Sequence, residues 1–255
     1  MSYLVLDIET YPDYKLWQPE PKKPRAKKDP ADAFAPLYAH KPIAVGIAML
    51  DDALNLVSLG CFGTSQFGQD ERALLSAVHE GMAQVMSSTA PTIVTFNGRG
   101  FDLPVLALRA LRHALPAGWY SNDHRKRYTE VHHLDLFDAL SESDSSRRAG
   151  FSLDTFCRII GLPGKLGFDG SMVRAAFDKG EIAKIEGYCL VDVMRTTFLL
   201  IRYLMMRGRI SREMFETATR ALWDQCQQRQ MTGVLFGADM NMLMGLGPTV
   251  ETPAA

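Results

Sequence analysis

The sequence predicts a mixed α/β fold, with helices packed on the faces of one β-sheet. Short apolar runs typical of strands lie mainly in the N-terminal part of the chain. Segments with apolar residues three or four positions apart, typical of helices, are interleaved with them and predominate later. This order of strands and helices is typical of a mixed sheet covered by helices. The chain has 255 residues and no internal repeat, so we expect one large domain.

The predicted strands begin with residues 3–9, where apolar and acidic residues alternate. Residues 12–42 are rich in Pro, Lys, Asp and Ala without periodicity, so we expect a long, exposed and partly disordered connection. Two β-like runs, 43–50 and 54–62, are separated by Asp residues, which indicates a hairpin. A further short strand is predicted for "TIVTF" at 92–96.

Helical spacing predicts the first helix over residues 70–86. A second helix follows a glycine-containing turn and carries Pro104 in its first turn. Residues 132–140 indicate the end of a strand that leads into another helix. Ser152 and Gly161 are the residue types with which helices begin and end, so a short helix is expected between them.

The C-terminal part is predicted to contain two long helices, over residues 181–206 and 211–230. The last stretch, about 20 residues with Met, Gly and Pro but little pattern, is expected to be a loose tail.

The composition, 47% hydrophobic and 22% charged, is ordinary for a soluble globular protein. Acidic residues begin at Asp7 without a preceding basic stretch, so we expect no signal peptide. The longest apolar run, "TTFLLIRYLMM", is short and contains Arg202. It predicts a core helix rather than a membrane span, so no membrane partner is expected.

Cysteine and histidine spacing argues against a zinc site. The cysteines are scattered without a CxxC pair, which favours buried apolar roles and a reducing, cytoplasmic location. His40, His132 and His133 show no helical HxxxH pattern, so we expect structural roles for them. The cysteines are Cys61, Cys157, Cys189 and Cys226.

Charge alone predicts no general affinity for nucleic acid, because the net charge is −1. Basic residues are nevertheless concentrated in "KKPRAKK" at 22–28 and "HRKR" at 124–127. Each stretch fits either a solvated loop or a contact with phosphates, and composition does not choose between them.

Asp7 and Glu9 stand two residues apart on the first predicted strand, so their side chains share one face. Leu4, Leu6 and Ile8 would then fill the opposite face. Two carboxylates on a half-buried surface repel each other and lose hydration, and no basic residue lies nearby in the sequence. A metal ion between them is the simplest explanation. The alternative is that both acids flank a strand end in water.

Two further positions place acids where a sheet-based site would use them. Asp102 follows the strand at 92–96 and stands at the entrance of a helix, where it would either cap that helix or join a site. Tyr188 and Asp192 are four residues apart on a predicted helix and therefore share a face. The alternative there is a tyrosine at the margin of the core with the aspartate in water.

These motifs together resemble the DEDD 3′–5′ exonuclease superfamily. They are "DIET", "FNGRGFDLPVL" and "YCLVDV", and their tyrosine is typical of the DEDDy branch. They are most similar to the stand-alone predicted PolB-like 3′–5′ exonucleases, related to the proofreading domains of family B DNA polymerases. "FSLDTFCRIIGLPGK" is also similar to that group, and the resemblance spans about residues 1–206.

The resemblance implies an RNase H-like fold with a central mixed sheet. Residues 1–210 would form the exonuclease domain, with 12–42 as a basic, Pro-rich insertion and 211–255 as a C-terminal helix and flexible tail of the same domain. The implied function is a metal-dependent 3′–5′ exonuclease that releases nucleoside 5′-monophosphates from nucleic acid with a free 3′ end, preferably single-stranded DNA. An exoribonuclease with the same site and a non-catalytic nucleic-acid-binding module are the alternatives.

By resemblance, Asp7, Glu9 and Asp192 would hold the metal that carries the attacking water. Asp7 would bridge to a second metal, with Asp102 supporting that ion directly or through water. Two divalent ions, Mg²⁺ or Mn²⁺, about 3.5–4 Å apart stabilise the attacking and leaving oxygens of a phosphodiester. Tyr188, whose ordinary pKa is near 10, would orient the water rather than act as a base.

Other residues are expected to contact the substrate. Asn97 matches the asparagine of the second motif and would hydrogen-bond the substrate, although it equally fits a turn residue. Phe101 would wedge against the terminal base or belong to the core. Ile8 and Thr10 would line the terminal-nucleotide pocket. Lys165 would reach a phosphate or remain in solvent.

Overall fold

The computed structural model describes residues 1–19, 34–142, 150–164 and 167–247. Its centre is a five-stranded sheet in the order β3-β2-β1-β4-β5. The strands are β1 (Tyr3–Pro12), β2 (His40–Leu50), β3 (Leu56–Gly63), β4 (Thr92–Thr95) and β5 (His133–Asp135). The pairs β1–β2 and β2–β3 are antiparallel, whereas β1–β4 and β4–β5 are parallel. The predicted mixed sheet is therefore confirmed, and β1 lies where its two halves meet.

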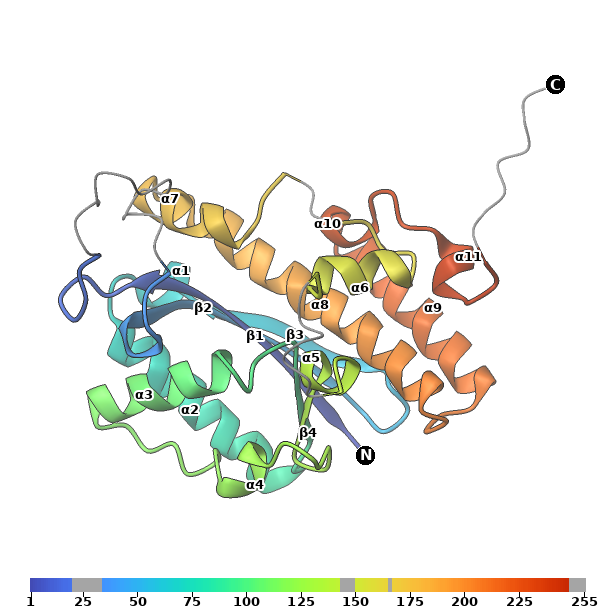
Figure 1. The fold of residues 1–255 in the computed structure, drawn as a ribbon, viewed down its shortest axis with the longest axis horizontal. Helices are drawn as coiled ribbons and strands as arrows, with labels where there is room; N and C mark the ends of the chain where they lie inside the picture. The colour runs from blue at the N-terminus through green and yellow to red at the C-terminus, as the bar shows by residue number, and fades with distance from the viewer. Residues whose placement is uncertain (20–33, 143–149, 165–166, 248–255) are drawn as a thin grey trace.

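Helices cover both faces of this sheet, as the sequence predicts (Figure 1). The α-helices are α1 (Thr64–Phe67), α2 (Glu71–Ser88), α3 (Asp102–His113), α4 (Asn122–Arg125), α5 (Leu136–Leu140), α6 (Leu153–Ile159), α7 (Val173–Asp178), α8 (Ile182–Met206), α9 (Arg212–Gln228), α10 (Thr232–Leu235) and α11 (Met240–Leu243). Short 3-10 turns precede β2 and α7, η2 (Leu37–Ala39) and η4 (Gly170–Met172). Within the described ranges, no helix combines the length and apolarity needed to cross a bilayer.

The alternation of β1 divides the core into two layers. Leu4, Leu6 and Ile8 pack with α2 and α3 on one face. Tyr3 and Val5 pack with α8 on the other face, in a core that α6 and α9 extend. In Figure 1, α8 crosses one face of the sheet while α2 and α3 lie on the other. The side chains that alternate with Leu4, Leu6 and Ile8 therefore point toward α8.

Gly46 on β2 allows α8 to pack closely against the sheet. A Cβ atom at this position would stand 2.9 Å from Cys189 Sγ and from Val193 Cγ2, both on α8. Gly46 is also the register partner of Asp7 on β1. The missing side chain therefore brings α8 down onto the sheet beside Asp7.

The prediction of an exposed connection over 12–42 is wrong at both described ends. β1 continues to Pro12, and β2 begins at His40. Asp13 forms an ion pair of 2.9 Å with Arg109, whose side chain is 1% exposed, and Ala35 is buried. Ion pairing and buried alanines leave no periodic signal in the sequence, which is why these ends read as loop. The basic stretch 22–28 lies outside the described residues.

The predicted loose tail is also partly wrong. Within this stretch α11 packs on the rest of the protein, and Leu243 and Met244 are buried; α10, directly before it, buries Val234. Helices of four residues are too short to show a helical period, so the sequence pattern did not reveal them. α9 shares a core with α8, and the placing of 1–210 and 211–255 in one domain stays a prediction.

Substitution of Gly46 tests the contact between α8 and the sheet. Gly46→Ala should lower the free energy of unfolding by about 1–3 kcal/mol, because the added methyl group overpacks the interface. It should also weaken Mg²⁺ binding, since α8 carries Asp192. Urea denaturation and calorimetry measure the two effects. Gly60→Ala on β3 is the matched control, because nothing lies within 4 Å of a Cβ there. Equal behaviour of the two variants would contradict this role of Gly46.

Candidate active site

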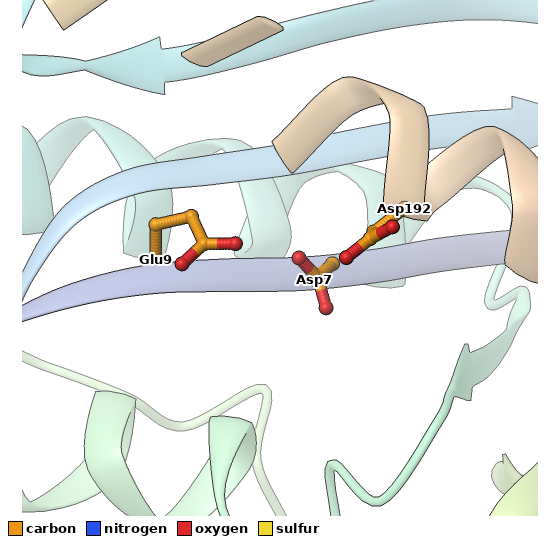
Figure 2. Close-up of side chains that lie close together, drawn as sticks. All are labelled: Asp7, Glu9 and Asp192. Atoms are coloured by element: carbon orange, nitrogen blue, oxygen red, sulfur yellow. The ribbon is translucent and has the colours of Figure 1, made fainter. Parts of the chain in front are cut away.

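Three acids meet where α8 crosses β1. Asp7 and Glu9 come from β1 and face α8, and Asp192 projects from α8 toward them (Figure 2). One carboxylate oxygen from each residue lies within 4.8 Å of the others. Oxygen ligands of a single Mg²⁺ ion span about 4 Å, so small side-chain rotations suffice to bind one ion. The donor set therefore fits a hard divalent cation.

The environment of Asp7 favours a proton or a cation. Burial raises the pKa of its carboxyl well above the ordinary 3.8, and the negative charges of Asp102, Glu9 and Asp192 raise it further. The thiol of Cys189 lies 3.7 Å from Oδ2 of Asp7 and acts in the opposite direction. Because like charges crowd this carboxylate, a bound divalent ion would be stabilised by the whole group.

Asp102 reaches the same site from the first residue of α3. Its Oδ1 accepts a hydrogen bond of 3.1 Å from the backbone N–H of Ile8, which lies between Asp7 and Glu9. Phe101 is the cap residue of α3 and makes no side-chain capping bond, so the sequence alternative of Asp102 as a cap finds no support. Burial raises the pKa of Asp102 to about 7.

Tyr188 stands one helical turn before Asp192, on the face that the i, i+4 spacing predicts. Burial raises the pKa of its hydroxyl above the ordinary 10, and the charge of Asp192 and a hydrogen bond to it add to the shift. The ring packs edge-on against Phe168, with centroids 5.1 Å apart. The phenol therefore stays protonated at neutral pH and donates toward the acids.

Arg195 is a member of the site that the sequence analysis missed. Its Nη1 lies 3.4 Å from Oδ1 of Asp192, and its side chain is 4% exposed. Nη2 donates to the backbone carbonyls of Gly164 and Gly233, at 2.9 and 3.0 Å. The spacing of Asp192 and Arg195, three residues apart on a predicted helix, was the available signal. Arg195 orients Asp192 and joins α8 to the start of α10.

Asp135 is a second residue that the sequence analysis missed. Its carboxylate accepts hydrogen bonds of 2.8 Å from the backbone N–H groups of Asn97 and Arg99. Asn97 has a left-handed backbone, with φ of 67°. These bonds hold the turn between β4 and α3 and thereby place Asp102, whose pKa the charge of Asp135 also raises.

The predicted substrate contacts lie in different environments. Phe101 packs near His40, with ring centroids 4.8 Å apart, and the hydroxyl of Thr10 lies 2.8 Å from Nδ1 of His40. Asn97 is exposed on its turn. The side chain of Ile8 is 5% exposed and belongs to the core, and its place in the terminal-nucleotide pocket stays a prediction. Lys165 lies outside the described residues.

The sequence matches the family described as "Predicted 3'-5' exonuclease related to the exonuclease domain of PolB" over residues 32–235. The chain belongs to this family. A search of curated proteins gave no match for this member of the PolB-related exonuclease family.

A solved structure shows the fold of this PolB-related exonuclease. The family B DNA polymerase from the hyperthermophilic archaeon Pyrobaculum calidifontis has a TM-score of 0.53 and 18% identity, over 80% of this chain and 24% of the polymerase. The moderately thermophilic Exonuclease I from Methylocaldum szegediense has a TM-score of 0.41 and 14% identity, over 79% of this chain and 45% of that protein. The chain thus spans about a quarter of the polymerase's length, 24%. The similarity to the polymerase confirms the predicted RNase H-like fold.

Asp102 makes the stability of the metal-free protein depend on pH. Its folded-state pKa of about 7 lies above the ordinary 3.8, so the folded protein keeps a proton that the unfolded chain releases between these values. The stability from this proton is complete below the ordinary pKa and is lost as the pH rises through about 7. The raised pKa of Asp7 acts in the same direction.

We expect Mg²⁺ to offset this loss, because the cation takes the place of the proton among the carboxylates. Thermal unfolding with EDTA or Mg²⁺ should show a larger Mg²⁺-induced rise in Tm at about pH 8 than at about pH 5. Asp7→Asn should reduce the rise, whereas Asp52→Asn, at an exposed position, should preserve it. An equal rise at both pH values would contradict the role given to these carboxyls.

Proposed function

We propose that this 3′–5′ exonuclease depends on two divalent cations and releases nucleoside 5′-monophosphates from the 3′ ends of single-stranded DNA. The observation that supports it most is the meeting of Asp7, Glu9 and Asp192 within 4.8 Å in a chain of this family. These acids would hold one Mg²⁺ or Mn²⁺ ion, and Asp7 and Asp102 the second. Such ions supply positive charge for the attacking and leaving oxygens of a phosphodiester.

The protein's own groups position the reacting atoms. Tyr188 keeps its proton and orients the nucleophilic water through its hydroxyl, next to Asp192. Arg195 holds Asp192 through a contact of 3.4 Å between its Nη1 and Oδ1 of the aspartate. Asp102 is fixed through the backbone of Ile8, so its position follows that of the strand that carries Asp7 and Glu9.

The preference for single strands has a physical reason. A terminal nucleotide must leave its stack and its partner before its phosphate reaches the acids, at a cost of a few kcal/mol for a paired end. Phe101 offers an aromatic surface to the splayed base, and Thr10 and Asn97 offer polar groups near it. Unpaired or frayed ends should therefore be degraded faster than blunt duplex ends.

One oligonucleotide labelled at either end tests the proposed direction of attack. With Mg²⁺, a 5′ label should give a ladder of shortening fragments, and a 3′ label should release mononucleotide at once. Release of mononucleotide from the 5′ label, or cutting of a circular single strand, would overturn the exonuclease assignment. An RNA version of the same oligonucleotide distinguishes a deoxyribonuclease from an exoribonuclease. Binding without cleavage of either strand would indicate a non-catalytic binding module.

Substitutions of the acids and of the tyrosine should have different effects on kcat and on Mg²⁺ affinity. Asp7→Asn and Asp192→Asn should each lower kcat on the order of 10²–10³-fold or more, because each removes a metal ligand. Tyr188→Phe should lower kcat less and leave Mg²⁺ affinity nearly unchanged, since its hydroxyl orients water only. Steady-state kinetics and calorimetry measure these effects, with exposed Asp52→Asn as the control. Loss of Mg²⁺ binding in the tyrosine variant would refute its assigned role.

A further inference from the structure

A cavity of about 520 Å³ lies against α8 next to the candidate active site. One wall is the face of α8 that carries Lys184, Gly187 and Tyr188, and the other is the connection between α9 and α10. Phe168 closes one side. Because Tyr188 and Arg195 also belong to the candidate active site, a molecule in the cavity would contact the side chains that orient Asp192.

The charged side chains that line the cavity are all basic among the described residues. Lys184, Arg195 and Arg229 line it, and the described lining residues include no Asp or Glu. Lys184 contacts Glu181 at 3.2 Å but is more than half exposed, so its ammonium remains open to an anion. The buried Nε of Arg195 has no hydrogen-bond partner among the described residues. This lining fits an anion that accepts several hydrogen bonds, such as a phosphate.

The aromatic wall of the cavity adds a surface for a base. Phe168 is partly exposed, and Nζ of Lys184 lies 4.8 Å from the centre of its ring. Aromatic rings next to basic side chains are typical of surfaces that bind single-stranded nucleic acid. The volume also lies within the usual range of pockets for small organic ligands.

Gly187 supplies an independent observation. Glycine is one of the least favourable residues in a helix interior, yet Gly187 stands in the second turn of α8, directly before Tyr188. No atom lies within 4 Å of a Cβ built there, so internal packing does not require a glycine. Gly46 differs, because α8 itself fills the space over it. The bare backbone at Gly187 leaves room for a ligand to approach α8 from the cavity.

We infer that this cavity is a second nucleotide-binding site, in which its basic side chains bind a nucleotide phosphate and Phe168 contacts the base of that nucleotide. The inference rests on the proposed function and deepens it. The occupant is a phosphate-bearing nucleotide next to the reacting one. Its source is either the neighbouring unit of the strand or the released nucleoside 5′-monophosphate, and the same chemistry recognises both.

Gly187→Ala tests this site without weakening the fold, because alanine favours the helix. The probes are deoxythymidine 5′-monophosphate, a thymidine dinucleotide and a longer oligothymidylate. We expect Gly187→Ala to weaken the binding of either the strand probes or the monophosphate several-fold. Arg229→Gln should weaken the binding of the same probes about ten-fold, the loss typical of one charged hydrogen bond. A higher KM for the longer strand alone identifies the strand as the source. A higher inhibition constant for the monophosphate identifies the product.

Two control variants separate ligand binding from helix stability. Gly81→Ala lies inside α2, where a Cβ would meet only Phe62, at 3.5 Å. Arg220→Gln lies at an exposed position on α9. Both controls should leave KM and product inhibition unchanged. The inference is overturned when Gly187→Ala and Arg229→Gln fold normally and match these controls for every probe.

Equilibrium binding to the metal-free protein distinguishes failure of this inference from failure of the proposed function. Fluorescence titration with labelled oligothymidylate, competed by the monophosphate, requires no turnover. If the protein binds nucleotide through Arg229 but cleaves no strand, the cavity site is supported and the proposed activity is contradicted. If the protein degrades 3′ ends and both cavity variants have the same binding constants as the unsubstituted protein, the proposed activity is supported and the cavity site is contradicted.

Discussion

Close packing of α8 on the sheet at Gly46 is the constraint on which the site depends. Gly46 pairs in register with Asp7, and Cys189 and Val193 of α8 occupy the space that a side chain there would need. Asp192 directly precedes Val193, so the same contact that completes the core also places its carboxylate beside Asp7. The geometry of these acids is thus a consequence of how α8 packs on the sheet, because Asp7 and Asp192 stand on a strand and a helix rather than on loops.

This packing is electrostatically costly without a cation. Burial and mutual repulsion raise the pKa of Asp7 and Asp102, which means that their charged forms are disfavoured in the folded protein. Part of the cost is offset locally by the N–H of Ile8 and by Arg195. The remainder is an energetic reason for the group to bind a divalent ion, since the ion relieves the repulsion that folding creates.

α8 connects the candidate active site to the positive cavity. Tyr188 and Arg195 face both, and Arg195 joins Asp192 to the carbonyls of Gly164 and Gly233. Arg195 therefore connects Asp192, a candidate metal ligand, to α10, which directly follows the segment that carries Arg229. Residues after α9, where the sequence pattern is weakest, therefore contribute to the environment of the acids.

Much of the site was predictable because periodicity reports the direction of a side chain relative to its own element. Alternation placed Asp7 and Glu9 opposite the apolar face of β1, and the i, i+4 spacing placed Tyr188 beside Asp192. Ion pairs such as Asp13–Arg109 and the four-residue helices near the C-terminus carry no period, so the sequence pattern missed them.

The sequence by itself therefore determined the kind of fold, the facing of each acid and, by resemblance, the family. Only the tertiary structure decided which groups meet: Arg195 with the carbonyl of Gly233, Asp102 with the backbone of Ile8, and Asp135 with the turn before α3. The physical reason is that local patterns set directions within one element, whereas the distance between elements depends on non-local packing, such as the fit of α8 over Gly46.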